Sequence, residues 1–138
     1  MAYISTPEVK EKREKLKAQF PKFRFSVRRD NMSSIEVAIL SGPLELPYGV
    51  IDHYKNPHEI GQCSGKGDSV NQYWYKDHYK ADYHINNVLW LGVLEKILEI
   101  LYEGNHDNSE PQTDYFDVGW YVNLQIGKWN KPYEVKNA

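Results

Sequence analysis

Cysteine is almost absent from this chain of 138 residues, because Cys63 is the only one. No disulfide can form within the chain, so we exclude the small secreted folds that depend on several disulfides. Long apolar runs are also missing, since the longest, at 88–94, is far shorter than the ~20 residues that a membrane-spanning helix needs. The first residues lack the basic and apolar pattern of a signal peptide. We therefore expect a cytoplasmic protein that has no membrane partner.

Recognisable catalytic and metal-binding motifs are missing as well. None of the five histidines forms the helical pair with an intervening glutamate that metalloproteases use. On one strand His78 and His84 would lie about 20 Å apart, at ~3.3 Å per residue, which is too far for one metal ion. The charged residue nearest to Cys63 in the sequence is Lys66, so the sequence shows no base that would activate the thiol. We predict no catalytic residue, no metal site and no cofactor.

The glycine-rich segment 61–68 resembles a phosphate-binding loop only superficially. It has one residue too few before the Gly-Lys pair, and Asp68, not serine or threonine, stands two residues after the lysine. The sequence shows no clear strand before it, and we interpret it as a mobile, exposed loop.

Charge is distributed unevenly along the chain, although the formal net charge is only −2. Residues 1–29 carry nine basic and three acidic side chains, whereas the remaining residues carry eight basic and sixteen acidic ones. This asymmetry predicts either a positive face on an otherwise acidic protein or a solvated helix with internal ion pairs.

Helix and strand patterns are clear near the N-terminus. Thr6-Pro7, or alternatively the pair of Ser5 and Glu8, marks the start of a helix over 7–19. The segments 22–28 and 34–40 alternate between apolar and polar residues around a turn cluster, which predicts an antiparallel hairpin.

The later part of the chain predicts a core helix and a long strand. Residues 87–103 are apolar nearly all round, with Asn86 or Asn87 as the cap and Gly104 after the end. Residues 117–127 alternate, and Gly127 is expected to form a bulge. We predict a single α+β domain over 1–138, in which an antiparallel sheet of the hairpin 22–28/34–40 and strand 117–127 packs on helix 87–103, with a charged N-terminal helix over 7–19.

Two groups of residues have binding character. Basic side chains on the first helix and the first strand suit phosphates or an acidic protein surface. Aromatic residues at 73–75 suit base stacking or a partner's pocket, or alternatively the core of a sheet. The candidate binding residues are Lys10, Arg13, Lys17, Lys22, Arg24 and Arg28 in the first group, and Tyr73, Trp74 and Tyr75 in the second.

Part of the chain resembles a known family. The motifs are Phe20-Pro21, Lys22-Phe23 through Phe25-Ser26-Val27-Arg28, Ser34-Ile35-Glu36-Val37 and Ser41-Gly42-Pro43. Together they resemble the beginning of a large polyvalent protein-associated domain, the twenty-ninth of its series, over about residues 7–43. The stretches 114–118 and 129–133 are also similar to stand-alone members. Such domains occur in phage and plasmid proteins, and the family has no established catalytic residues. The resemblance implies an origin in a mobile element and a role in defending it against its host.

We therefore predict a non-enzymatic binding module, with an anti-defence role, whose partner is a host protein complex or nucleic acid. The sequence is also compatible with a homodimer. Two alternatives use the aromatic and histidine segment 73–84: a sponge that sequesters a signalling nucleotide, and a small nucleotide-processing enzyme with a pocket around Tyr73, His78 and His84.

Overall fold

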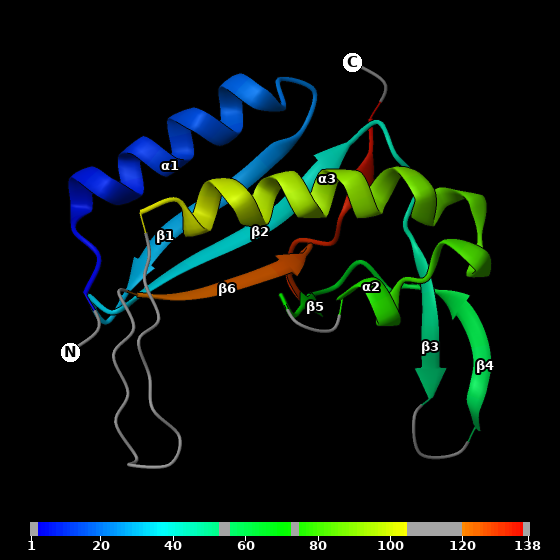
Figure 1. The fold of residues 1–138 in the computed structure, drawn as a ribbon. Helices are drawn as coiled ribbons and strands as arrows, with labels where there is room; N and C mark the ends of the chain where they lie inside the picture. Colours follow the sequence, from blue (N-terminus) through cyan, green and yellow to red (C-terminus); the bar gives the residue numbers. More distant parts are fainter. Residues whose placement is uncertain (1–2, 53–55, 73–74, 105–119, 137–138) are drawn as a thin grey trace, which may run out of the picture.

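A computed structural model describes residues 3–52, 56–72, 75–104 and 120–136, and it confirms the α+β fold class. Figure 1 shows two long helices lying next to each other on one face of a mixed sheet. The strand order of this sheet is β1-β2-β6-β5. Within the described residues, no helix is long and apolar enough to cross a membrane.

Helix α1, Thr6–Gln19, confirms the N-terminal helix prediction. Ser5 is its N-cap: the hydroxyl of Ser5 accepts a hydrogen bond from the backbone N–H of Glu8, and the Glu8 carboxylate accepts from the backbone N–H of Ser5, each at 3.2 Å. This capping box confirms the second of the two predicted starts, and Thr6 is already helical. The buried Lys12 donates to the carbonyl oxygen of Glu103, which ties α1 to the end of the other long helix.

The predicted hairpin is confirmed by β1, Arg24–Asp30, and β2, Ser34–Gly42, which pair antiparallel. The two central turn residues, Asn31 and Met32, have φ values of 51° and 62°. Two positive φ values give a turn whose twist matches that of the flanking strands.

Helix α3, Ile85–Tyr102, confirms the predicted core helix, and Gly104 follows its end with a φ of 83°. The predicted cap is wrong, because the N-cap is His84, whose Nδ1 accepts from the backbone N–H of Asn86 at 3.1 Å. The side chain of Asn87 is not free for capping, since it bonds to Tyr48 and Lys80.

Strand β6, Tyr121–Ile126, pairs with β2 in parallel. The prediction of an entirely antiparallel sheet is therefore wrong for this pair, and the predicted residues 117–119 lie outside the described ones. A parallel pair needs a crossover connection, and here the crossover carries α3 over one face of the sheet.

The middle of the chain, which gave no clear pattern, forms short elements. Their bounds are β3, Tyr48–Asp52; β4, Asn56–Gln62; β5, Asp68–Val70; α2, Tyr75–His78; and a 3-10 turn, Ala81–Tyr83. Strands β3 and β4 form a separate two-stranded sheet, whereas β5 pairs antiparallel with β6. A final strand β7, Glu134–Val135, pairs with the end of β2.

The hydrophobic core lies between the two long helices and the face of the sheet that they cover. Trp90 and Leu94 of α3 and Ile35 and Ile39 of β2 are fully buried members of one core cluster. Because β2 alternates, Val37 shares the core face with them, whereas Glu36 and Ala38 point to the opposite face of the sheet, which the two helices leave open.

Candidate functional site

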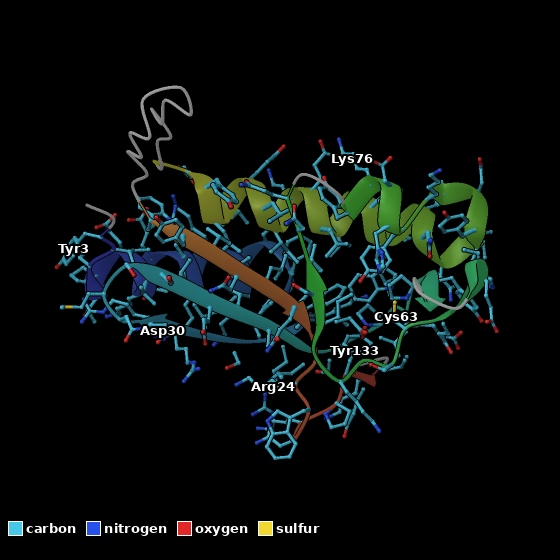
Figure 2. All side chains as sticks on the ribbon, turned by 90° about the horizontal axis from the view of Figure 1, so that it is seen from below. Tyr3, Arg24, Asp30, Cys63, Lys76 and Tyr133 are labelled. Atoms are coloured by element: carbon cyan, nitrogen blue, oxygen red, sulfur yellow. The ribbon has the colours of Figure 1, made fainter. Side chains whose placement is uncertain are left out.

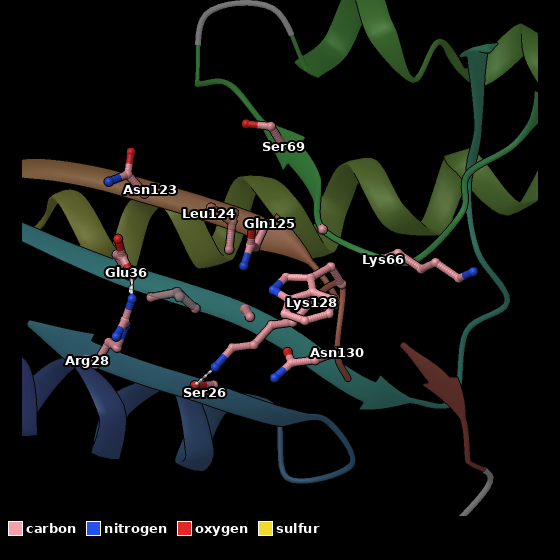
Figure 3. A pocket seen from close by; sticks show the side chains of 14 residues that line it. Ser26, Arg28, Glu36, Lys66, Ser69, Asn123, Leu124, Gln125, Lys128 and Asn130 are labelled. Atoms are coloured by element: carbon pink, nitrogen blue, oxygen red, sulfur yellow. Dashed lines mark hydrogen bonds and ion pairs between the residues drawn. The ribbon is translucent and has the colours of Figure 1, made fainter. Parts of the chain in front are cut away.

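The open face of the sheet carries a groove of about 670 Å³ (Figure 3). It crosses β1, β2 and β6, and the turn after β6 stands at one end. Polar and charged side chains dominate its lining. They are Ser26, Arg28, Glu36, Lys66, Ser69, Asn123, Gln125, Lys128 and Asn130.

Strand alternation makes the floor of this groove polar. On β1 Val27 enters the core, so its neighbours Ser26 and Arg28 face the groove. On β6 Asn123 and Gln125 face the groove in the same way. Within the described residues, the two amide side chains on β6 make no hydrogen bond, so their donors and acceptors are available to a ligand.

Cations outnumber anions around the groove. Arg28 forms an ion pair with Glu36 across β1 and β2, with 2.6 Å between Nη2 and Oε2. Lys128 reaches over the floor, and its Nζ donates to the hydroxyl of Ser26 at 2.9 Å. Lys66 lies at the loop end, and its ammonium extends away from the floor (Figure 3).

Two further cations flank the same face. Arg24 is exposed and alternates with Ser26 on β1, and Figure 2 shows it toward the end of the sheet near Tyr133. Lys131 is the bridge partner of Lys128, and paired residues of a two-stranded turn project to the same side. The cations that have no carboxylate partner are therefore concentrated at one end of the groove.

Trp129 stands at that end. The backbones of Lys128 and Lys131 exchange two hydrogen bonds of 3.0 and 3.1 Å, which leaves Trp129 and Asn130 at the tip of a tight turn. The Trp129 side chain is 83% exposed, the largest value among the exposed large hydrophobic residues of the described part. The turn follows Gly127, which has a φ of 73°. A fixed backbone thus presents an indole ring to solvent beside a polar groove.

Sequence reasoning did not select Trp129 as a binding residue. The signal was present, since Gly127 was expected to be a bulge and Asn130 favours a turn tip. A tryptophan between a bulge and a turn residue cannot continue the apolar alternation of the strand. It therefore has no place in the core that the strand helps to form.

The structure does not bring the predicted basic residues into one surface. Lys10, Arg13 and Lys17 belong to α1, on the helix side of the sheet, whereas Arg24 and Arg28 lie on the open face. Arg13 donates to the carbonyl oxygen of Val27 at 2.8 Å and thus covers the outer edge of β1. The exposed Lys22 lies in the turn between α1 and β1.

Other charged side chains of α1 interact with groups of the same molecule. Lys15 forms ion pairs of 2.9 Å with Glu11 and with Glu103. Burial lowers the pKa of Lys12, which lies near the ring of Trp120. The helix therefore fits, in part, the alternative of a charged helix with internal ion pairs.

The aromatic segment 73–75 is only partly described, because Tyr73 and Trp74 lie outside the described residues. Tyr75 is buried in the core cluster, but it belongs to α2, so the interpretation of this segment as sheet core is correct for its burial and wrong for its secondary structure. In the alternative enzyme pocket, His84 already caps α3, and its ring stacks on Tyr48 with 4.0 Å between centroids.

The glycine-rich loop is exposed only in part, since Ser64 and Lys66 are exposed whereas its glycines are not, and β4 precedes it. Asp68 accepts from the backbone N–H of Gly65 at 2.6 Å, and the carbonyl oxygen of Gly65 accepts from Tyr133 N–H at 2.8 Å. Gly65 is buried as a result. These bonds tie the loop to the C-terminal segment. Within the described part of the chain, no group of three or more His, Cys, Asp or Glu side chains is placed to hold a metal ion.

Cys63 is expected to react slowly with iodoacetamide at pH 8. Burial raises the pKa of its thiol from 9.0 to about 12, and only the thiolate is nucleophilic. We expect labelling of the folded protein to be at least about 100-fold slower than labelling of the urea-unfolded protein, measured by mass spectrometry. Similar rates in both states would contradict this. The same shift contributes stability that is complete below pH 9 and is lost as the pH rises toward 12.

Comparison with known proteins gives one match. The profile of a family described as large polyvalent protein associated domain 29 matches residues 4–88. The match contains the segment 7–43 that carries the resemblance, and it extends through the short middle elements into the start of α3. Strand β6 and the Trp129 turn lie beyond it. No curated protein and no solved structure matches the chain.

Proposed function

Because the chain belongs to the family of the large polyvalent protein associated domain 29, we propose that it is a non-enzymatic binding module of a phage or plasmid. Its partner is nucleic acid, either free or within a host defence complex, and contact with that partner gives it an anti-defence role. The binding surface is the groove on the open face of the sheet.

The observation that carries this proposal is the combination of unused amides and surplus cations on that face. The whole chain has a formal net charge of −2, so a positive groove is not a general property of its surface. Around the groove Arg24, Lys66, Lys128 and Lys131 have no carboxylate partner among the described residues, whereas Glu36 is neutralised by Arg28. Positive charge with free hydrogen-bonding groups is complementary to a phosphate backbone and base edges.

Binding is favoured over catalysis by the residues that could otherwise react. The Cys63 thiol stays protonated at neutral pH because burial raises its pKa to about 12. The Nδ1 of His84 is used to cap α3, which leaves it unavailable as a base. The groove itself offers amides, hydroxyls and cations, which are binding groups.

The test is binding of labelled DNA and RNA oligonucleotides, followed by fluorescence anisotropy at about 50 and 200 mM salt. We expect binding that weakens with salt, and at least about 10-fold weaker binding in an Arg24→Gln/Lys128→Gln variant, with a smaller salt slope. The matched control is Lys10→Gln/Lys17→Gln, which removes the same charge from α1 and should bind normally. Absence of binding at low salt, or equal losses in both variants, would overturn the proposal.

A further inference from the structure

The positions of the floor amides limit the form of nucleic acid that fits. Asn123 and Gln125 are two residues apart on β6, so their side chains emerge about 6.6 Å from each other. Successive bases of a duplex strand are only about 3.4 Å apart and are stacked. Neighbouring amides therefore match bases that are spread apart, as in an extended single strand, whose edges are free for hydrogen bonding.

The exposed ring of Trp129 can stack on a partner that has an accessible flat face. Its turn is closed by two backbone hydrogen bonds, so the ring is held at the end of the groove and not on a loose tail. In a duplex the flat faces of the bases are covered by their neighbours, whereas every base of a single strand can stack on an aromatic side chain.

The charges lie where the backbone of such a strand would pass. Arg28 is paired with Glu36 in the middle of the floor, so the unpaired cations Lys128 and Lys131 are those next to Trp129. A cationic margin beside an aromatic platform is the arrangement by which single strands are bound without sequence preference. The groove volume of about 670 Å³ suits a few nucleotides and not a helical segment.

We propose that the groove binds single-stranded nucleic acid, with one base stacked on Trp129, phosphates beside Lys128 and Lys131, and base edges against Asn123 and Gln125. This inference rests on the proposed function and narrows its partner. It assigns to the C-terminal turn the main stacking contact of the site.

The experiment compares a labelled 12-nucleotide oligonucleotide as a single strand and as a duplex, with wild type, Trp129→Ala and Trp129→Phe. We expect the single strand to bind at least about 10-fold more tightly than the duplex. Trp129→Ala should weaken single-strand binding by about 10-fold or more while the salt slope stays unchanged, because stacking releases no counterions. Trp129→Phe should keep most of the affinity. Met32→Ala, which shortens another exposed apolar side chain, should bind normally.

The outcomes separate the two proposals. Equal binding of duplex and single strand, or unchanged affinity in Trp129→Ala, would overturn the single-strand inference while salt-sensitive binding still supports the nucleic-acid function. No binding of either form at low salt would overturn both. Because Trp129 is exposed, its variants should unfold at the same urea concentration as wild type, which confirms that affinity and not folding is measured.

Discussion

Gly127→Ala is expected to destabilise the protein by about 3 kcal/mol or more. A Cβ atom at this position would overlap the carbonyl oxygen of Gly65 and lie 2.7 Å from the backbone nitrogen of Tyr133. These are backbone atoms, which cannot rotate away as a flexible side chain does. The φ of 73° adds strain for any residue with a side chain. The measurement is the urea midpoint of unfolding, followed by circular dichroism.

Gly92→Ala is the matched control for this substitution, with an effect of opposite sign. Gly92 lies on α3, and a Cβ there would meet no atom within 4 Å. Alanine should therefore stabilise the helix by about 0.5–1 kcal/mol, since glycine loses more backbone entropy on folding. If both variants changed the urea midpoint in the same direction, the close approach of backbone atoms at Gly127 would not explain the loss of stability in Gly127→Ala.

Asn87→Ala is expected to cost about 2–4 kcal/mol. Asn87 is 0% exposed and makes three hydrogen bonds: its Oδ1 accepts from the backbone N–H of Tyr48 at 2.7 Å, and its Nδ2 donates to the carbonyl oxygens of Tyr48 at 2.7 Å and Lys80 at 2.8 Å. Alanine would leave these backbone groups without their partner and detach β3 from α3. Thermal and urea unfolding should both report the loss.

Asn86→Ala provides the neighbouring control. Its side chain is half-buried and makes one hydrogen bond, from Nδ2 to the carbonyl oxygen of Leu46 at 3.2 Å. We expect a loss of about 1 kcal/mol or less. A loss as large as that of Asn87→Ala would show that removal of any side chain at the start of α3 is harmful, and that the three bonds of Asn87 are not specifically responsible.

The helices α1 and α3 and the hairpin could be predicted because the residues that determine each of them are close together in the sequence. The pair of Ser5 and Glu8 marks a helix start whatever packs nearby, and alternation over β1 and β2 shows which residues are buried. The direction of β6 could not be predicted in this way. An alternating strand has the same pattern in parallel and antiparallel pairs, so the path of the crossover decides between them.

The candidate site was predictable only in part. Arg24 and Arg28 were selected for their charge, and the structure places both on the open face, where they remain predicted contacts. Lys10, Arg13 and Lys17 of α1 were predicted to belong to the same binding surface, because the sequence does not show which side of a sheet a helix covers. The position of Trp129 depends on the close approach of Gly127 to Gly65, two residues that are far apart in the sequence. A contact of this kind leaves no periodic pattern.

The parallel pairing of β2 with β6 has a consequence for how the chain reaches its native state. Partners such as Ile35 and Val122 are far apart in sequence, so closing this pair costs more chain entropy than closing the hairpin. During synthesis β1 and β2 emerge long before β6, and one edge of β2 stays open until then. An open apolar strand edge invites pairing with other chains. We therefore expect the chain to be open to such pairing between the synthesis of β2 and that of β6.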